Sequence, residues 1–434
     1  MASGVDKLLR KAGNKYQQGS ARAAADIYKK ILARDPNHLD ANYLLGALYA
    51  EQGQLEPALK YTRLAAGINP NSPWVQNNLG NLLRMKGEYA SAITAYQKAL
   101  AIKPDFAETF SNLGIAHYRL GQTDEAIQAY QKALQLQPGL IQARLNLGRL
   151  LQDSGESAAA AQCFEKVLTA DPHNPRALTE LGRLYLEQGE NAKAIECFEH
   201  YLIQDPQDRY GVQAKLAFLG RAETPNKMPA TLVRETYERK ARNWDQDVRQ
   251  AGHQFFGAEN IQRTLQRLVP GASGQHVLDL GCGTGTCGTF LRPLAAHLEG
   301  VDLSQPMLDV AAQKQLYDAL LCDDIVNYLQ RHPDRYDLIT ASGVLIFFGD
   351  LAPVLQAART ALRPGGLLVF TLYEGSDDIR VRHNFHFEHS QSYLHRQADE
   401  AGLEVVQLEQ AVHELHAGEP QAGLVVTLQR PVGN

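Results

Sequence analysis

The sequence predicts a multidomain chain with an all-α N-terminal half and an α/β C-terminal half. In the first half, proline recurs every 34 residues, at Pro36, Pro70, Pro104, Pro138, Pro172 and Pro206. In the second half, apolar runs of strand length alternate with helical segments, and one run opens into the glycine-rich stretch "HVLDLGCGTGTCG", from His276 to Gly288. A period of this length is typical of stacked helix pairs, and a strand that runs into a glycine turn is typical of a nucleotide-binding sheet.

Length and composition limit the classes of protein to consider. The chain has 434 residues, and its formal net charge of −5 gives no reason to expect nucleic acid or an anionic membrane as a partner. No apolar run approaches the roughly 20 residues that span a bilayer, and the first residues lack the apolar core of a signal peptide. Five cysteines, an odd number, argue against a disulfide framework. We therefore expect a cytoplasmic protein with reduced thiols.

Two more positions keep the period of the prolines. Alanine occupies the twentieth position of all six repeats, and glycine occupies the fifteenth, at Gly19, Gly53, Gly87, Gly121, Gly155 and Gly189. Small residues let paired helices approach closely, glycine makes the turn between them, and proline ends the second helix. Residues 5–208 resemble the tetratricopeptide repeat (TPR) family, although the tryptophan often found at the fourth position is absent. We expect a TPR superhelix over residues 1–221, with six repeats and a capping helix.

One polar position is also repeated. Asn78, Asn112 and Asn146 take the sixth position of three successive repeats, so we expect them to line up along the first helices. Asparagine is a mediocre helix former, so three in register require a reason. One interpretation is hydrogen bonding between helices. The other is an amide ladder similar to that of the O-GlcNAc transferase repeat domain, which implies a peptide or protein partner on the concave TPR face.

The second half contains seven candidate strands with helical segments between most of them. These strands cover residues 276–280, 297–302, 318–322, 335–341, 366–372, 403–408 and 423–429. Alternation of strands and helices predicts an open, Rossmann-like α/β sheet of seven strands over residues 270–434.

The glycine loop after the first strand fits two registers. Gly283, Gly285 and Gly288 form a dinucleotide fingerprint, but the residues before Gly283 are then not the apolar end of a strand. The alternative register uses Gly281, Gly283 and Gly285 and puts Asp279 at the strand end. An acidic residue there is typical of S-adenosylmethionine sites, whereas an NAD site has an apolar residue.

Three later features accompany this loop. Asp302 ends the second strand in "GVDLSQPML", Asp323 and Asp324 end the third in "LLCDDI", and "ALRPGGLLVF" leads into the fifth. Their order and spacing resemble class I S-adenosylmethionine-dependent methyltransferases over residues 230–430. The resemblance implies S-adenosylmethionine as cofactor, with Asp302 at its ribose hydroxyls and the aspartate pair near its adenine. The implied cofactor-binding residues of this part are Asp279, Gly281, Gly283, Gly285, Asp302, Leu303, Asp323, Asp324 and Ile325.

Residues 222–269 are predicted to link the two halves and to cover the cofactor. The stretch "LVRETYERKARNWDQDV" is amphipathic, with Tyr237, Ala241 and Trp244 on one face. It is similar to the helix that precedes the sheet in many of these enzymes, which implies that Tyr237 and Trp244 bind the cofactor. A helix that merely docks the two domains is the alternative.

The acceptor side is expected after the fourth and fifth strands. After the fourth, Gly343 and Phe347 replace an aspartate and a tyrosine that related repeat-containing methyltransferases often show. After the fifth, the dense histidines at 383, 386 and 389 leave three interpretations open: a wall with one general base, a metal site, or a polar hairpin without catalytic duty. His389 and Tyr393 match an H-S-x-x-Y element of this group and are the catalytic candidates, and we assign no metal site.

These features favour a methyltransferase that recruits a peptide or protein acceptor through its repeats. One alternative is a methyltransferase for a small-molecule or carrier-bound acceptor, with the repeats docking a partner protein. The other is a TPR scaffold without turnover. Phe347 and Phe348 near the expected pocket favour the small acceptor, whereas the intact Asp279, glycine loop and Asp302 argue against the scaffold.

Overall fold

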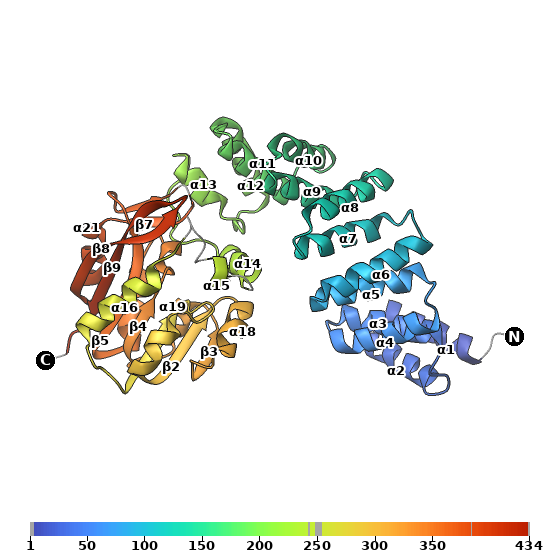
Figure 1. Cartoon of the computed structure of the whole chain (residues 1–434), viewed down its shortest axis with the longest axis horizontal. Coiled ribbons are helices and arrows are strands. Elements are labelled where there is room, and N and C mark those ends of the chain that lie inside the picture. Colours follow the sequence, from blue (N-terminus) through green and yellow to red (C-terminus); the bar gives the residue numbers. More distant parts are fainter. Residues whose placement is uncertain (1–3, 242–243, 248–253, 383, 433–434) are drawn as a thin grey trace. The chain divides into compact units, whose positions relative to one another are not determined.

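The computed structural model describes residues 4–241, 244–247, 254–382 and 384–432. Their contacts divide the chain into two compact units, Met1–Gly189 and Glu190–Asn434 (Figure 1). This division falls within the sixth predicted repeat, so the last repeat helix and the capping helix belong to the second unit. None of the described helices has the length and apolarity needed to cross a membrane.

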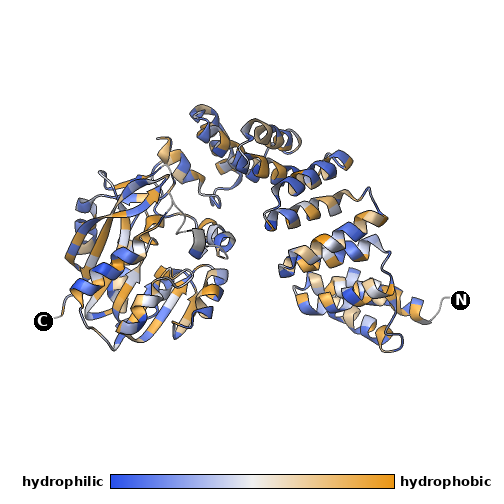
Figure 2. Ribbon diagram, viewed as in Figure 1, coloured by the Kyte–Doolittle hydropathy of each residue, from blue (hydrophilic) through white to orange (hydrophobic). Residues whose placement is uncertain are grey.

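The first unit is an all-α array, as the 34-residue period predicts. Its helices are α1 (Gly4–Gln17), α2 (Ala21–Leu32), α3 (Leu39–Glu51), α4 (Leu55–Ile68), α5 (Pro73–Lys86), α6 (Tyr89–Ile102), α7 (Ala107–Arg119), α8 (Thr123–Leu136), α9 (Ile141–Asp153), α10 (Ser157–Ala170) and α11 (Pro175–Glu187). Apolar and polar residues alternate along these helices, as expected for helices buried on one side (Figure 2). The glycine that ends the first helix of each pair has a φ between +71° and +84°, where a side chain would strain the backbone.

Gly80 and Gly114, which are 34 residues apart in the first helices of their pairs, lie where paired helices touch. A Cβ at Gly80 would lie 2.5 Å from the ring of Tyr96, and a Cβ at Gly114 would lie 2.8 Å from the ring of Tyr130. Both tyrosines are buried. Glycine is therefore required here because an aromatic ring of the second helix packs directly on the backbone of the first.

The second unit begins with four helices and continues as an α/β domain. The four are α12 (Asn191–Gln204), α13 (Val212–Phe218), α14 (Ala230–Lys240) and α15 (Trp244–Asp247). The strands are β1 (Gln275–Leu280), β2 (Ala295–Asp302), β3 (Ala319–Cys322), β4 (Tyr336–Ala341), β5 (Leu362–Glu374), β6 (Ile379–Val381), β7 (Phe387–His389), β8 (Glu404–His416) and β9 (Glu419–Gln429). The remaining α-helices are α16 (Gly257–Leu268), α17 (Gly288–Leu291), α18 (Gln305–Gln313), α19 (Ile325–Gln330), α20 (Ala352–Ala361) and α21 (Gln391–Glu400).

The strands form one nine-stranded sheet. Strands β3-β2-β1-β4-β5 are parallel in that order, β9 lies antiparallel beside β5, and β8 lies antiparallel beside β9. All seven predicted strands are present. The predicted count of seven was incomplete, because β6 and β7, of three residues each, form a hairpin at the end of β5. Such short runs in a polar stretch carry no alternation that a sequence pattern could reveal.

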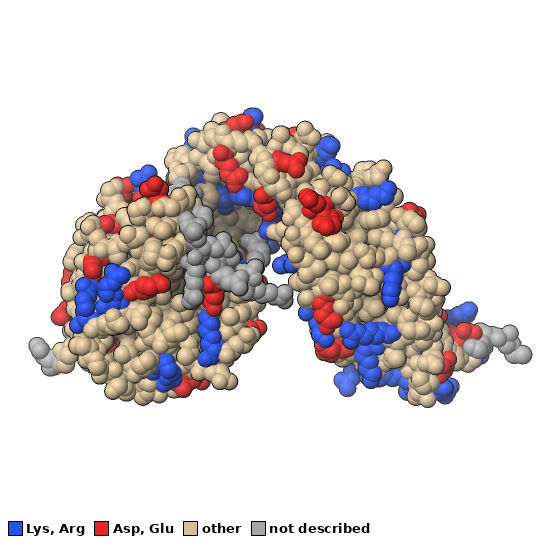
Figure 3. Space-filling model, in the orientation of Figure 1, with Lys and Arg blue, Asp and Glu red and all other residues tan. Residues whose placement is uncertain are grey.

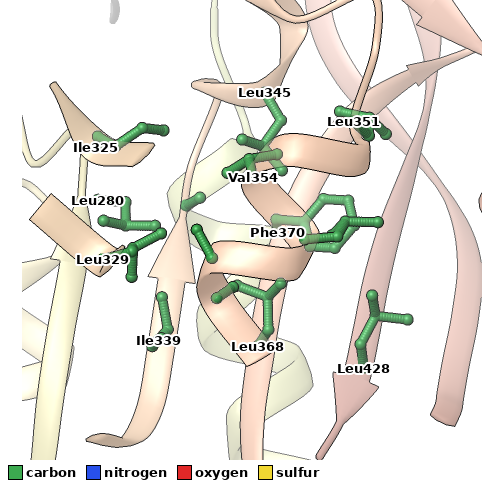
Figure 4. Close-up of a cluster of buried hydrophobic side chains, with 14 of the residues drawn as sticks. Leu280, Ile325, Leu329, Ile339, Leu345, Leu351, Val354, Leu368, Phe370 and Leu428 are labelled. Carbon is green, nitrogen blue, oxygen red and sulfur yellow. The ribbon is translucent and has the colours of Figure 1, made fainter. Parts of the chain in front are cut away.

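Helices cover both faces of the sheet. On one face, Leu368 and Phe370 of β5 lie beside Val354 of α20 in the largest buried cluster, to which α19 and α21 also contribute (Figure 4). On the other face, Ile261 and Leu265 of α16 pack on the buried side chains of the central strands. The carboxyl ends of the parallel strands share one edge of the sheet, so the loops after them are brought together there.

The capping helix and the segment after it pack on the α/β domain. Ala214 of α13 shares a buried cluster with Met228 and with Phe387 of β7. The N–H of Met228 donates to the carbonyl of Phe347 (2.8 Å), and two further N–H groups of the loop after β4 donate to the carbonyl of Asn226. The segment before α14 is thus hydrogen-bonded to the loop that follows β4.

Candidate functional site

The loop between β1 and α17 holds its glycines in a conformation that favours glycine. Gly281, Gly283 and Gly285 have φ values of +60°, +53° and +84°. A Cβ at Gly281 would lie 2.2 Å from a methyl carbon of Val344, whereas a Cβ at Gly283 would meet nothing closer than 4.0 Å. The first glycine therefore permits close packing, and the second borders open space.

Asp302, at the end of β2, fixes this loop. One carboxylate oxygen accepts from the N–H of Gly283 (2.9 Å) and the other from the N–H of Ser304 (2.8 Å). Burial raises the pKa of Asp302 above its ordinary value, and these backbone donors oppose the rise. Because each carboxylate oxygen has two lone pairs, acceptor capacity remains for a ligand.

Asp279 lies behind the loop. Its side chain is 1% exposed and accepts hydrogen bonds from the hydroxyls of Tyr317 (2.7 Å) and Thr340 (3.1 Å). Burial raises the pKa of Asp279 to about 7. Asp279 therefore links the end of β1 to β4 and to the segment before β3. Gly285 also faces inward, since a Cβ there would lie 3.0 Å from the ring of Tyr317.

Asp323 and Asp324, which the sequence places near the adenine, have different partners at the end of β3. Asp324 caps α19 by accepting from two backbone N–H groups, and its other oxygen lies 3.7 Å from Nζ of Lys227. Asp323 forms an ion pair with an arginine at the end of α19. Leu303 and Ile325 lie on the same side of the loop cluster as Asp324, where all three border one cavity.

Helices α14 and α15 cover the glycine loop. The rings of Tyr237 and Trp244 pack edge to face with centroids 5.2 Å apart, and Tyr237 meets Phe347 in the same way at 5.9 Å. Thr284 of the loop donates a hydrogen bond to Asp245 (2.5 Å). Residues 242, 243 and 248–253 of the segment predicted to cover the cofactor lie outside the described residues.

These elements enclose a cavity of about 470 Å³ at the carboxyl edge of the parallel strands. Its size falls within the range of small-molecule and cofactor sites, roughly 300–1,000 Å³. Most of the residues that the sequence assigned to the cofactor line it: Tyr237, Trp244, Gly281, Gly283, Asp302, Leu303, Asp324 and Ile325. Asp279, Gly285 and Asp323 are not among the lining residues.

The cavity extends along the sheet edge from the β2–β3 side to the β5 side, where four polar side chains line it. They are Tyr373 of β5, His386 before β7, and His413 and Glu414 of β8. The hydroxyl of Tyr373 donates to Glu414 (2.6 Å), and the rings of Tyr373 and His413 lie 4.3 Å apart. Burial lowers the pKa of His413 to about 3. The sequence singled out only His386, because β8 extends past the predicted strand end at residue 408 and its pairing brings His413 and Glu414 here.

The two predicted catalytic residues occupy a different place. His389 is fully buried, its Nε2 lies 2.9 Å from the carbonyl of Gly349, and burial lowers its pKa to about 4. The hydroxyl of Tyr393 accepts from the N–H of Leu351 (3.0 Å). Neither side chain is among those that line the cavity, and both contact the loop that carries Phe347. Residue 383 of the histidine group lies outside the described residues.

The three asparagines of the repeats lie half-buried on α5, α7 and α9. The amide of Asn78 donates to the hydroxyl of Tyr43 (2.9 Å), and the carbonyl of Asn146 accepts from Gln142 (2.8 Å). Asn112 has the same half-buried position between them. Local hydrogen bonding thus accounts for part of the amide capacity of two of the three residues.

Comparison with known proteins supports the assignments of the repeat half and of the α/β half. Residues 250–408 match the family model of a methyltransferase domain, and residues 15–82, 80–121 and 104–209 match TPR models, the last being that of cytochrome c-type biogenesis protein H. The second unit therefore contains a methyltransferase domain, matched over residues 250–408. The chain as a whole is a TPR-repeat protein fused to a methyltransferase domain.

Curated relatives of the methyltransferase domain are O-methyltransferases. The chain is 33% identical over 133 residues to malonyl-[acyl-carrier protein] O-methyltransferase of Yersinia pestis, covering 30% of this chain and 49% of that protein. It is 32% identical over 106 residues to ubiquinone biosynthesis O-methyltransferase of Paraburkholderia xenovorans, covering 23% and 44%. The chain therefore spans about half the length of the curated relatives it matches.

Solved structures similar to this chain include MamA and YrrB. MamA is 28% identical over 40% of this chain and 96% of its own, with a TM-score of 0.36. YrrB, described as a TPR protein with an unusual peptide-binding site, is 23% identical over 44% and 98%, with a TM-score of 0.38.

Proposed function

We propose that the second unit is an S-adenosylmethionine-dependent methyltransferase and that the cofactor binds between the glycine loop, Asp302 and the α14–α15 cover. Asp302 carries the proposal, because it borders the cavity, fixes the N–H of Gly283 and keeps acceptor capacity for a pair of ribose hydroxyls. Leu303, Asp324 and Ile325 would hold the adenine end. S-adenosylmethionine supplies an activated methyl group on a sulfonium.

The chain's own residues position the reactants and exclude water. Tyr237, Trp244 and Phe347 form an edge-to-face cluster over the loop, which shields the cavity from solvent on that side. Such shielding strengthens electrostatic interactions inside the site and keeps the reacting groups aligned. Asp279 contributes from behind, by holding the end of β1 to β4.

For the acceptor, we propose a small molecule or a carrier-bound group that enters the cavity on its β5 side. The aromatic wall around Phe347 and Tyr373 supports a compact acceptor over a long peptide. The O-methyltransferases among the relatives support the same class. In this scheme the TPR array docks a partner protein, which raises the local concentration of a carried acceptor.

The test is calorimetric titration of S-adenosylmethionine and S-adenosylhomocysteine into the wild-type chain and Asp302→Ala. Binding by the wild type that is lost in the variant is the expected result. Circular dichroism controls for folding, and Asp334→Ala serves as a matched control because Asp334 is exposed and pairs only with Arg430 among the described residues. Absence of binding to the wild type would overturn the proposal.

A second candidate is a peptide or protein acceptor bound through the repeats, which the alignment of Asn78, Asn112 and Asn146 favours. Their replacement by alanine separates the two candidates. If the repeats hold the acceptor peptide, methylation of protein in a cell extract falls while methylation of a small acceptor is unchanged. If the small acceptor is the substrate, the triple variant retains the turnover of the wild type.

A further inference from the structure

We infer that the β5–β8 side of the cavity is the acceptor subsite and that it takes a phenol, whose hydroxyl hydrogen-bonds to the ring of His413. The inference rests on the proposed function and deepens it by naming the substrate class. It depends on a buried imidazole, on the rings around it and on the charges that line the cavity.

His413 has a buried polar atom that points to a ligand on this side of the cavity. Its side chain is 1% exposed, yet it lines the cavity, and its Nε2 has no hydrogen-bond partner among the described residues. A buried polar atom without a partner costs about 1–3 kcal/mol, so it is normally matched by a ligand or an ordered water. A ligand hydroxyl can match it, because a neutral imidazole nitrogen either donates or accepts a hydrogen bond.

The surroundings of His413 fit a flat aromatic molecule. Phe255 packs edge to face on His413 (5.1 Å), and Phe347 does the same on His386 (5.0 Å). Tyr373 stacks on His386 with an interplanar angle of 16° (5.9 Å). Aromatic rings pack well against further rings in offset or edge-to-face geometry, so these planes favour a planar acceptor.

The charges of the cavity favour a neutral acceptor over an anion. More carboxylates than lysines line it. The carboxylates are Asp245, Glu259, Asp302, Asp324 and Glu414, and the lysines are Lys227 and Lys240. A carboxylate acceptor would add a like charge to this set. An amine would be held as its cation, which has no lone pair to attack a methyl group. A phenol hydroxyl is neutral and keeps its nucleophilic lone pairs.

The proposed transfer is balanced within the site. The phenol oxygen forms a bond to the methyl carbon as the carbon–sulfur bond breaks and its electron pair stays on sulfur, which becomes the neutral thioether. The phenol oxygen becomes strongly acidic as it gains the methyl group, so its proton passes to the imidazole of His413 despite the lowered pKa of that ring. The positive charge of the sulfonium passes to the ring with it. The proton leaves to solvent when the methyl ether is released.

The experiment uses the full chain, labelled S-adenosylmethionine and three probes of similar size: catechol, benzoate and benzylamine. We expect label transfer to catechol alone. We expect His413→Asn to lower kcat by about 100-fold, as is typical for loss of a group that accepts a proton, with the affinity for S-adenosylmethionine unchanged. His395→Asn, on an exposed histidine of α21, is the matched control and should retain wild-type turnover.

A second variant protects the test against misfolding of His413→Asn. Tyr373→Phe keeps the ring but removes the hydrogen bond to Glu414, and we expect a raised KM for catechol with kcat little changed. The inference is overturned if S-adenosylmethionine binds but label goes to benzoate, to benzylamine or to none of the probes, or if both variants match His395→Asn. If S-adenosylmethionine does not bind, the proposed function fails and the inference fails with it.

Discussion

The hydroxyl of Thr284 in the glycine loop donates a hydrogen bond to the carboxylate of Asp245 in α15, at 2.5 Å. The other oxygen of Asp245 lies 2.7 Å from Nζ of Lys314, which follows α18. One carboxylate thus joins the covering helix to the glycine loop and to the helix after β2. Helix α15 and the glycine loop beneath it are therefore linked by a charge-assisted hydrogen bond.

We predict that Thr284→Val weakens the binding of S-adenosylmethionine. The substitution keeps the branched shape but removes the donor to Asp245, and a hydrogen bond to a charged group contributes about 1.5 kcal/mol, or about tenfold in Kd. Calorimetric titration measures the change. Thr289→Val is the control, because among the described residues the hydroxyl of Thr289 bonds only to the carbonyl of Thr286, in its own turn. Equal affinities of the two variants would show that this hydrogen bond does not hold the cover in place.

The glycine loop allows a prediction that separates stability from cofactor binding. Alanine at Gly281 would meet Val344 at 2.2 Å, so Gly281→Ala should destabilise the fold strongly. Alanine at Gly283 strains only the backbone, by about 1 kcal/mol, because its Cβ enters open space. We expect Gly283→Ala to melt within a few degrees of the wild type but to lose S-adenosylmethionine affinity, since the methyl occupies the cavity. Calorimetric scans and titrations on both variants check this, and full affinity of Gly283→Ala would contradict it.

His389 predicts how stability depends on pH. Its pKa is lowered by burial to about 4 from 6.5, so the unfolded chain takes up a proton at a pH where the folded chain does not. Its contribution is therefore present above pH 6.5 and is lost as pH falls from about 6.5 toward 4, by up to about 3 kcal/mol. Asp279 acts in the opposite direction, because burial raises its pKa to about 7 and protonation favours the folded state.

The variant His389→Gln isolates the contribution of His389 to the pH dependence of stability. Glutamine keeps a donor for the carbonyl of Gly349 but does not titrate, so we expect its loss of stability between pH 7 and pH 4.5 to be smaller than that of the wild type by about 2 kcal/mol. Scanning calorimetry of the second unit's transition at both values is the measurement. His395→Gln, at an exposed site, should behave as the wild type does. Identical pH dependence of stability in all three proteins would show that His389 does not contribute to it.

The sequence predicted the architecture more completely than it predicted the acceptor side of the cavity. The repeat array was predictable because each turn glycine and each helix contact recurs at a fixed interval, as Gly80 and Gly114 show. The glycine loop was predictable because positive φ values require glycine. His413 was not, because its place in the wall depends on the antiparallel pairing of β8 with β9 far along the chain. His389 stood out by its local pattern, and the structure places its ring beside the carbonyl of Gly349 and not among the residues that line the cavity.

The boundary between repeats and catalytic domain yields the last prediction. The sequence places it at residue 221, whereas the compact second unit begins at Glu190 and α13 packs through Ala214 on Met228 and Phe387. A fragment of residues 222–434 would expose that apolar surface, while a fragment of residues 190–434 keeps it covered. We expect the longer fragment to melt higher by roughly 5–10 °C, in line with 2–4 °C per kcal/mol for a domain of this size. The segment at Met228 is hydrogen-bonded to the loop that carries Phe347, so the shorter fragment should also bind catechol more weakly. Equal melting temperatures would show that α13 belongs to the repeats alone and would return the boundary to residue 221.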